Sequence, residues 1–105
     1  MSEERIQQLK AFLEEEPDNS FLTFALGLEY VKQDRLDEAR GLFEKVQQKD
    51  PQYIGVYYHL GKLYESLGEN KKAVDTYRCG IEIARKAGDQ HSASELQEAL
   101  AEWES

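Results

Sequence analysis

The chain has 105 residues, of which 21 are acidic and 13 are basic, and its formal net charge is −8. This charge argues against nucleic acid and against anionic membranes as partners, because both are bound by Lys and Arg side chains that offset phosphate charge. The length fits one domain, and the sequence has no run apolar enough to span a bilayer.

The N-terminus and the cysteine content predict a cytoplasmic protein. The first residues, MSEERIQQ, have neither the basic nor the apolar part of a signal peptide. Cys79 is the single cysteine of the chain, so it cannot form an internal disulfide, and a reducing compartment fits best. We expect Cys79 to be a buried and unreactive side chain.

The spacing of apolar residues predicts an all-α chain of six helices. In chain order these cover residues 3–15, 20–33, 36–49, 53–67, 70–87 and 90–104. The inward side chains of the first helix are expected to be Ile6, Leu9, Phe12 and Leu13.

Residues that begin or end helices stand at the predicted boundaries. Asn19 or Ser20 can cap the second helix with a side-chain oxygen. Pro51 stops the third helix, and Gly68 and Gly88 follow the fourth and fifth helices as C-terminal caps.

The last helix is expected to act as a cap on the preceding ones. Ser92 and Glu95 have the spacing of a capping box at its start. Its inward stripe should consist of Ala93, Leu96, Leu100 and Trp103, beneath a charged outer face.

The pattern Leu-Gly-x-x-Tyr occurs twice, and its glycines are 34 residues apart (61 minus 27). Repetition at this period indicates a stacked array of helical hairpins. A glycine inside a helix costs about 1 kcal/mol relative to alanine, so each one is expected at a close crossing of two helices. The predicted contacts are Gly27 with Ala39 and Gly61 with Ala73.

These residues resemble the signature of the tetratricopeptide repeat family. Residues 20–53 match it at Leu26, Gly27, Tyr30, Ala39, Phe43 and Pro51. Residues 54–87 match it at Leu60, Gly61, Tyr64, Leu67, Gly68, Ala73 and Tyr77. The resemblance implies a single domain over residues 1–105, a right-handed array of antiparallel helical hairpins. Residues 1–19 would then be a partial repeat and residues 88–105 a C-terminal capping helix.

The sequence contains no pattern of catalytic, metal-binding or cofactor-binding residues, so we expect no enzyme activity, metal or cofactor. His91 and Glu95 can share one face of a helix. Zinc usually takes three or four ligands, so this pair is expected to be a solvated pair at the start of a helix.

The helix at residues 20–33 has apolar residues on more than the one face that packing against the adjacent helices would bury. One stripe, formed by Leu22, Thr23, Leu26 and Tyr30, should face the adjacent helices. A second stripe on another side consists of Phe21, Phe24, Leu28 and Val31. In the family that the chain resembles, the first helix of each hairpin lines a concave groove. The second stripe is therefore either one wall of an open groove or a buried side of the fold.

We predict a scaffold or adaptor that binds a peptide or helix of another protein in an apolar groove. The predicted groove residues are Phe21, Phe24, Leu28, Val31, Tyr58, His59 and Lys62. The alternative is self-association into a homo-oligomer, through the same groove or through the ends of the array. A clamp for carboxylate tails, which some family members have, is not expected, because its cations are missing at the matching places, Phe24, Leu28, His59, Asp89 and Ala93.

Overall fold

The computed structural model describes residues 2–104, and these form six α-helices with no strand among them. The helices are α1 (Ser2–Glu15), α2 (Ser20–Lys32), α3 (Leu36–Lys49), α4 (Gly55–Ser66), α5 (Asn70–Lys86) and α6 (Gln90–Ala101). The predicted all-α class and the six helices are confirmed. None of these helices has the length and apolarity that crossing a membrane requires.

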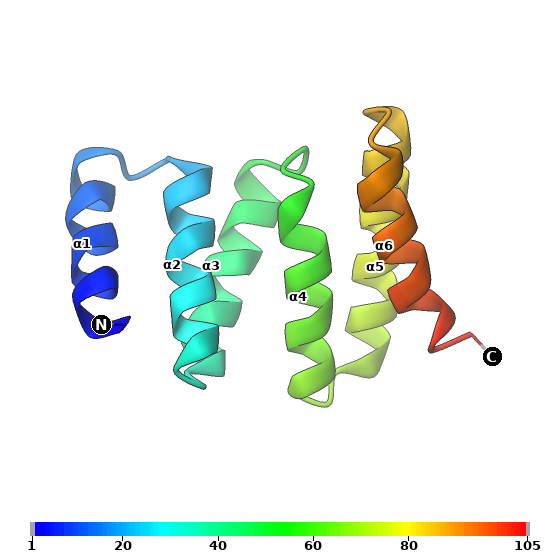
Figure 1. Cartoon of the computed structure of the whole chain (residues 1–105), viewed down its shortest axis with the longest axis horizontal. Coiled ribbons are helices and arrows are strands. Elements are labelled where there is room, and N and C mark those ends of the chain that lie inside the picture. Colours follow the sequence, from blue (N-terminus) through cyan, green and yellow to red (C-terminus); the bar gives the residue numbers. More distant parts are fainter. Residues whose placement is uncertain (1, 105) are drawn as a thin grey trace. The chain divides into compact units, whose positions relative to one another are not determined.

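The chain divides into two compact units, residues 1–50 with α1 to α3 and residues 51–105 with α4 to α6. Within each unit, successive helices run in opposite directions (Figure 1). In unit one, α2 packs against both α1 and α3. In unit two, α5 packs against α4 and α6, and α6 also contacts α4. The single domain and the repeat limits at residues 20–53 and 54–87 stay predictions.

The core of unit one lies along α2. Ile6 and Leu9 of α1 are buried, and so is Phe43 of α3. Phe12 was expected to point inward, but it is 54% exposed. Because α1 packs mainly against α2, its buried stripe is narrow, and Phe12 falls outside it.

The core of unit two is built around the aromatic residues of α4 and α5. Tyr57 and Tyr77 are fully buried, and the hydroxyl of Tyr57 donates a hydrogen bond of 2.6 Å to the carbonyl oxygen of Pro51. Cys79 was expected to be buried, but it is exposed. The buried stripe of α5 includes Tyr77 and Ile81, and Cys79 lies on the opposite side of the helix.

Three helical glycines lie where a side chain would collide with a ring. A Cβ atom added at Gly27 would be 2.5 Å from Cε1 of Phe43. A Cβ atom at Gly61 would overlap the ring of Tyr77, and one at Gly80 would be 2.5 Å from Cβ of Tyr57. Close crossings are thus present at both repeated glycines, but against aromatic rings. The expected contacts of Gly27 with Ala39 and of Gly61 with Ala73 stay predictions, because the nearest atoms at each glycine are ring atoms.

Three helices end in the same hydrogen-bonding pattern, in which one residue adopts a left-handed conformation. Gly68 (φ 77°) follows α4 and Gly88 (φ 75°) follows α5, as predicted. Asp34 takes the same place after α2 with φ 59°. In each case the next N–H bonds back to the helix, as Arg35 N does to Tyr30 O at 2.9 Å. Asp34 therefore carries a backbone cost that the two glycines avoid.

We expect Asp34→Gly to raise the free energy of unfolding by about 0.5–1 kcal/mol, because glycine adopts positive φ without steric cost. The matched change Gly68→Asp should lower it by a similar amount. Urea unfolding of both variants measures the effect. A lower midpoint for Asp34→Gly than for the original chain would contradict the prediction.

Side-chain caps begin α2 and α6. Asn19 Oδ1 accepts a hydrogen bond of 2.9 Å from Leu22 N, which confirms the first predicted cap. At α6 the cap is Asp89, whose Oδ1 accepts from Ser92 N at 3.0 Å. This backbone hydrogen bond from Ser92 lowers the pKa of the Asp89 carboxyl group. The predicted capping box that began at Ser92 was wrong.

Candidate functional site

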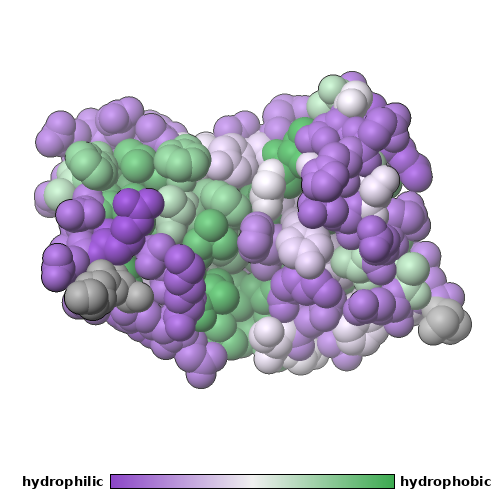
Figure 2. All heavy atoms as spheres, in the orientation of Figure 1, coloured by the Kyte–Doolittle hydropathy of each residue, from purple (hydrophilic) through white to green (hydrophobic). Residues whose placement is uncertain are grey.

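The second apolar stripe of α2, consisting of Phe21, Phe24, Leu28 and Val31, is less buried than the first and is called the α2 stripe below. Phe21 is 62% exposed and Val31 is 38% exposed. Phe24 and Leu28 between them are half-buried. Figure 2 shows hydrophobic atoms gathered along α2. The two ends of the stripe are therefore exposed apolar surface.

The middle of the α2 stripe also belongs to the core of unit one. The ring of Phe24 lies beside that of Phe43, with 5.6 Å between the ring centroids and 37° between the ring planes. Aromatic pairs at such distances contribute beyond their buried area. Phe24 is thus held by packing, whereas Phe21 and Val31 expose more of their surface.

The three predicted site residues of unit two, Tyr58, His59 and Lys62, lie on α4. Tyr58 and Lys62 line a hollow of about 290 Å³ between α4 and α6. Tyr58 and His59 line a neighbouring hollow of about 320 Å³ between the same helices. The two hollows share Tyr58 and Glu95, and together they are called the α4–α6 groove.

The aromatic and cationic side chains of α4 lie beside one another in the α4–α6 groove. The rings of Tyr58 and His59 meet edge to face, with 5.5 Å between their centroids. Lys62 Nζ lies 5.7 Å from the centroid of the Tyr58 ring. Desolvation lowers the pKa of the His59 imidazole, and the nearby Glu95 carboxylate partly opposes this by raising the pKa. The residue as a whole is exposed.

The opposite wall of the α4–α6 groove is acidic, which sequence reasoning missed. Glu95, Glu98 and Glu102 line it, together with Ala99. The charged face of α6 had been assigned to the solvent side of a capping helix. The signal was present in the sequence, because steps of three and four residues place these three glutamates on one face of a helix.

Glu65 links α4 to α5 and to the segment after α6. Its Oε2 atom accepts hydrogen bonds from the Tyr77 hydroxyl at 2.5 Å and from Trp103 Nε1 at 3.1 Å. Burial and the bond to Glu65 raise the pKa of the Tyr77 phenol far above its ordinary value. Trp103 lies beyond the end of α6 and is 39% exposed, so its expected place on the buried stripe was only partly right.

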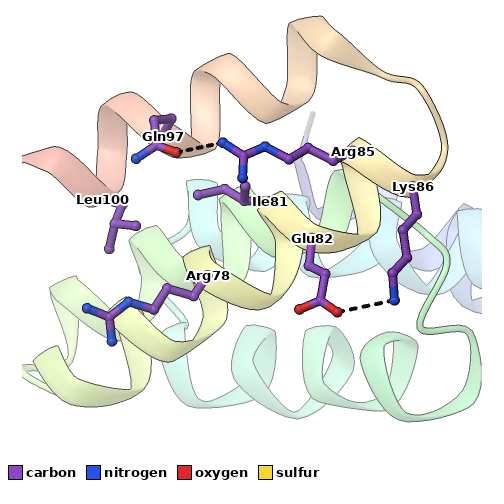
Figure 3. Close-up of a pocket in the computed structure, with 7 residues that line it drawn as sticks. All are labelled: Arg78, Ile81, Glu82, Arg85, Lys86, Gln97 and Leu100. Atoms are coloured by element: carbon purple, nitrogen blue, oxygen red, sulfur yellow. Dashed lines mark hydrogen bonds and ion pairs between the residues drawn. The ribbon is translucent and has the colours of Figure 1, made fainter.

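A third hollow of unit two, of about 340 Å³, lies between α5 and α6 over Ile81 and Leu100 (Figure 3). Its cations already have partners. Arg85 Nη2 donates to Gln97 Oε1 at 3.4 Å, and Lys86 Nζ lies 3.2 Å from Glu82 Oε1. Arg78 bonds to Glu104, outside the hollow. An acidic ligand would therefore have to compete with existing contacts.

The structure provides no constellation for metal chemistry among residues 2–104. No group of three or more His, Cys, Asp and Glu side chains is placed to hold a metal ion there. His91 Nε2 lies 3.5 Å from Glu95 Oε2, so the two share one face of α6 as expected.

Comparison with known proteins finds tetratricopeptide repeat proteins both by family model and among solved structures. A family model described as Tetratricopeptide repeat matches residues 30–102, more than half of the chain. The crystal structure of a tetratricopeptide repeat domain protein from Salinibacter ruber is 48% identical, covering 82% of this chain and 96% of that one, with a TM-score of 0.79. The solution structure of a protein from Bordetella parapertussis is 30% identical, covering 92% and 84%, with a TM-score of 0.80.

One solved structure of low sequence identity resembles this chain in its fold alone. The TPR2B domain of yeast Sti1, solved in complex with pHsp70, is 16% identical, covering 91% of this chain and 77% of that one, with a TM-score of 0.85. Among curated proteins, none matches the chain significantly.

Proposed function

Because the chain belongs to the tetratricopeptide repeat family, we propose that it is a scaffold or adaptor that binds a segment of a partner protein. Members of this family generally mediate protein–protein interaction. The proposed binding residues are the α2 stripe of unit one and, in unit two, Tyr58, His59 and Lys62. The role is non-catalytic and uses no cofactor, and a cytoplasmic location stays a prediction from the single cysteine.

The exposed ends of the α2 stripe carry the proposal. Phe21 is 62% exposed on the surface of unit one. Burying a side chain of this kind contributes about 1.5–3 kcal/mol, whichever molecule covers it. Exposed large apolar side chains that lie together commonly mark interaction sites. An apolar helix or peptide of a partner would cover Phe21 and Val31.

Self-association is the second candidate, and the same apolar surface favours it. A second copy of the chain could cover Phe21 and Val31 as well as a different protein could. The two candidates differ in their concentration dependence. Self-association makes the mass in solution rise with protein concentration, whereas an adaptor alone stays at the mass of one chain.

We expect the double variant Phe21→Ser, Val31→Ser to lose the partner proteins that the original chain captures from the cells that produce it. Its free energy of unfolding should change little, because surface substitutions usually alter this quantity by no more than about 0.5 kcal/mol. Quantitative mass spectrometry of the captured proteins, together with urea unfolding, measures both effects.

Phe12→Ser is the matched control, because Phe12 is 54% exposed in the same unit but lies outside the α2 stripe. This variant should keep the partners. Equal capture by the original chain and by the double variant would show that the α2 stripe is not the binding surface. Sedimentation at several concentrations tests self-association in the same set of proteins.

A further inference from the structure

The two walls of the α4–α6 groove differ in chemistry. Tyr58 of α4 presents an aromatic ring, and α6 presents Glu95, Glu98 and Glu102 around Ala99. Its two hollows, of about 290 and 320 Å³, share Tyr58, so they adjoin along α4. This groove can hold side chains of an added segment, and its walls determine their chemistry.

The negative charge of the groove is not balanced within unit two. Glu98 and Glu102 have no ion-pair partner among residues 51–104. Glu95 faces two histidines, His91 at 3.5 Å and His59 of the groove, and a histidine is charged only when protonated. Like charges three and four residues apart destabilise a helix. A cationic ligand would remove this repulsion.

Lys62 shows how a cation is held on this surface. It is the one lysine or arginine among the described residues that line the groove. Its Nζ atom lies 5.7 Å from the centroid of the Tyr58 ring and 3.8 Å from Glu65 Oε2. An aromatic face and a carboxylate are the two groups that attract an ammonium or guanidinium group. Tyr58 and the glutamates of α6 offer the same two groups to a ligand.

Given the partner segment proposed above, we infer that its part in the α4–α6 groove carries lysine or arginine side chains. The cations lie against Glu95, Glu98 and Glu102, and their aliphatic stems contact Tyr58 and Ala99. Long basic side chains suit this surface because the stem is apolar and the head is charged. An acidic segment is repelled, and a purely apolar one leaves the carboxylates uncompensated.

The test uses a fluorescein-labelled peptide of nine residues in which lysine and arginine alternate with leucine. Fluorescence anisotropy should show binding to the complete chain that weakens with added salt, because salt screens exposed charges. The triple variant Glu95→Gln, Glu98→Gln, Glu102→Gln should raise the Kd about tenfold, since each exposed pair contributes modestly. The variant should stay folded, because it removes repulsion from α6, and circular dichroism checks this.

The control is a second triple variant, Glu14→Gln, Glu15→Gln, Glu16→Gln, in unit one. It changes the net charge by the same amount, from −8 to −5 (−8 plus 3), and all three side chains are exposed. Its Kd should stay close to that of the original chain. A peptide with glutamate at every basic position should not bind.

Three results would overturn the inference. They are an equal loss of affinity in both triple variants, equal binding of the acidic peptide, and no binding of the basic peptide at millimolar concentration. None of these touches the proposed function, because that is tested by partner capture with substitutions of Phe21 and Val31. If the Phe21→Ser, Val31→Ser variant loses its partners while the original chain does not bind the basic peptide, the chain is an adaptor whose α4–α6 groove takes a different ligand.

Discussion

Replacing Phe43 by alanine should lower the free energy of unfolding by about 3–5 kcal/mol, the usual range for a buried phenylalanine. Phe43 is 0% exposed, and its ring is packed against Gly27 and beside Phe24. Removing the ring leaves a cavity that a glycine cannot fill. Natural domains have only about 5–15 kcal/mol of stability, so the loss is a large fraction of the total.

Chemical unfolding followed by circular dichroism measures this effect. Phe43→Leu is the matched control, because it keeps most of the buried volume, and such changes usually cost less than about 1.5 kcal/mol. A loss below about 1 kcal/mol for Phe43→Ala, with cooperative unfolding retained, would show that the ring contributes little to the core of unit one.

Gly61→Leu should lower the free energy of unfolding by about 1–3 kcal/mol through overpacking in unit two. A side chain at this position would collide with the ring of Tyr77, which is 0% exposed. The ring cannot swing away easily, because its hydroxyl donates a 2.5 Å hydrogen bond to Glu65, one turn further along α4. Relief of the collision therefore requires a shift between α4 and α5.

Gly41→Leu is the control for this prediction. Gly41 is also inside a helix, but it is exposed, and a Cβ atom there would meet nothing within 4 Å. Leucine forms helices better than glycine, so this variant should be as stable as the original chain or about 0.5–1 kcal/mol more stable. Thermal unfolding that gave both variants the same midpoint would contradict the predicted crossing at Gly61.

The repeated glycines explain why the fold could be predicted from the sequence. The period of 34 residues placed Gly27 and Gly61 at helix crossings, and the steps of three and four residues located all six helices. The atoms nearest to each glycine belong to an aromatic ring one turn after the expected alanine. Phe43 follows Ala39 on the same face of α3, and sequence spacing does not show that the ring comes nearest to the glycine.

Errors arose where burial depends on the number of neighbouring helices. The spacing of Phe12 fits an inward position, but α1 packs mainly against α2, so Ile6 and Leu9 are its well-buried residues. Cys79 could have been predicted correctly, because Tyr77 and Ile81 already mark the buried face of α5.

The candidate site was only partly visible in the sequence. The α2 stripe was found because a helix that is apolar on two sides is unusual. Its division into a packed Phe24 and more exposed Phe21 and Val31 required the position of the Phe43 ring. The acidic wall of the α4–α6 groove required knowledge of how α6 lies against α4, which the spacing of glutamates alone does not give.

The exposure of Cys79 affects how the solution mass of the chain is interpreted. Since the chain has one cysteine, a disulfide between protein molecules in a purified sample joins two copies. Exposed thiols oxidise in air through their thiolate form, and the linked product would have twice the mass. Such a product would resemble self-association, so sedimentation needs a reducing agent or the Cys79→Ser chain. The same thiol gives a single attachment point on α5 for a fluorescent label.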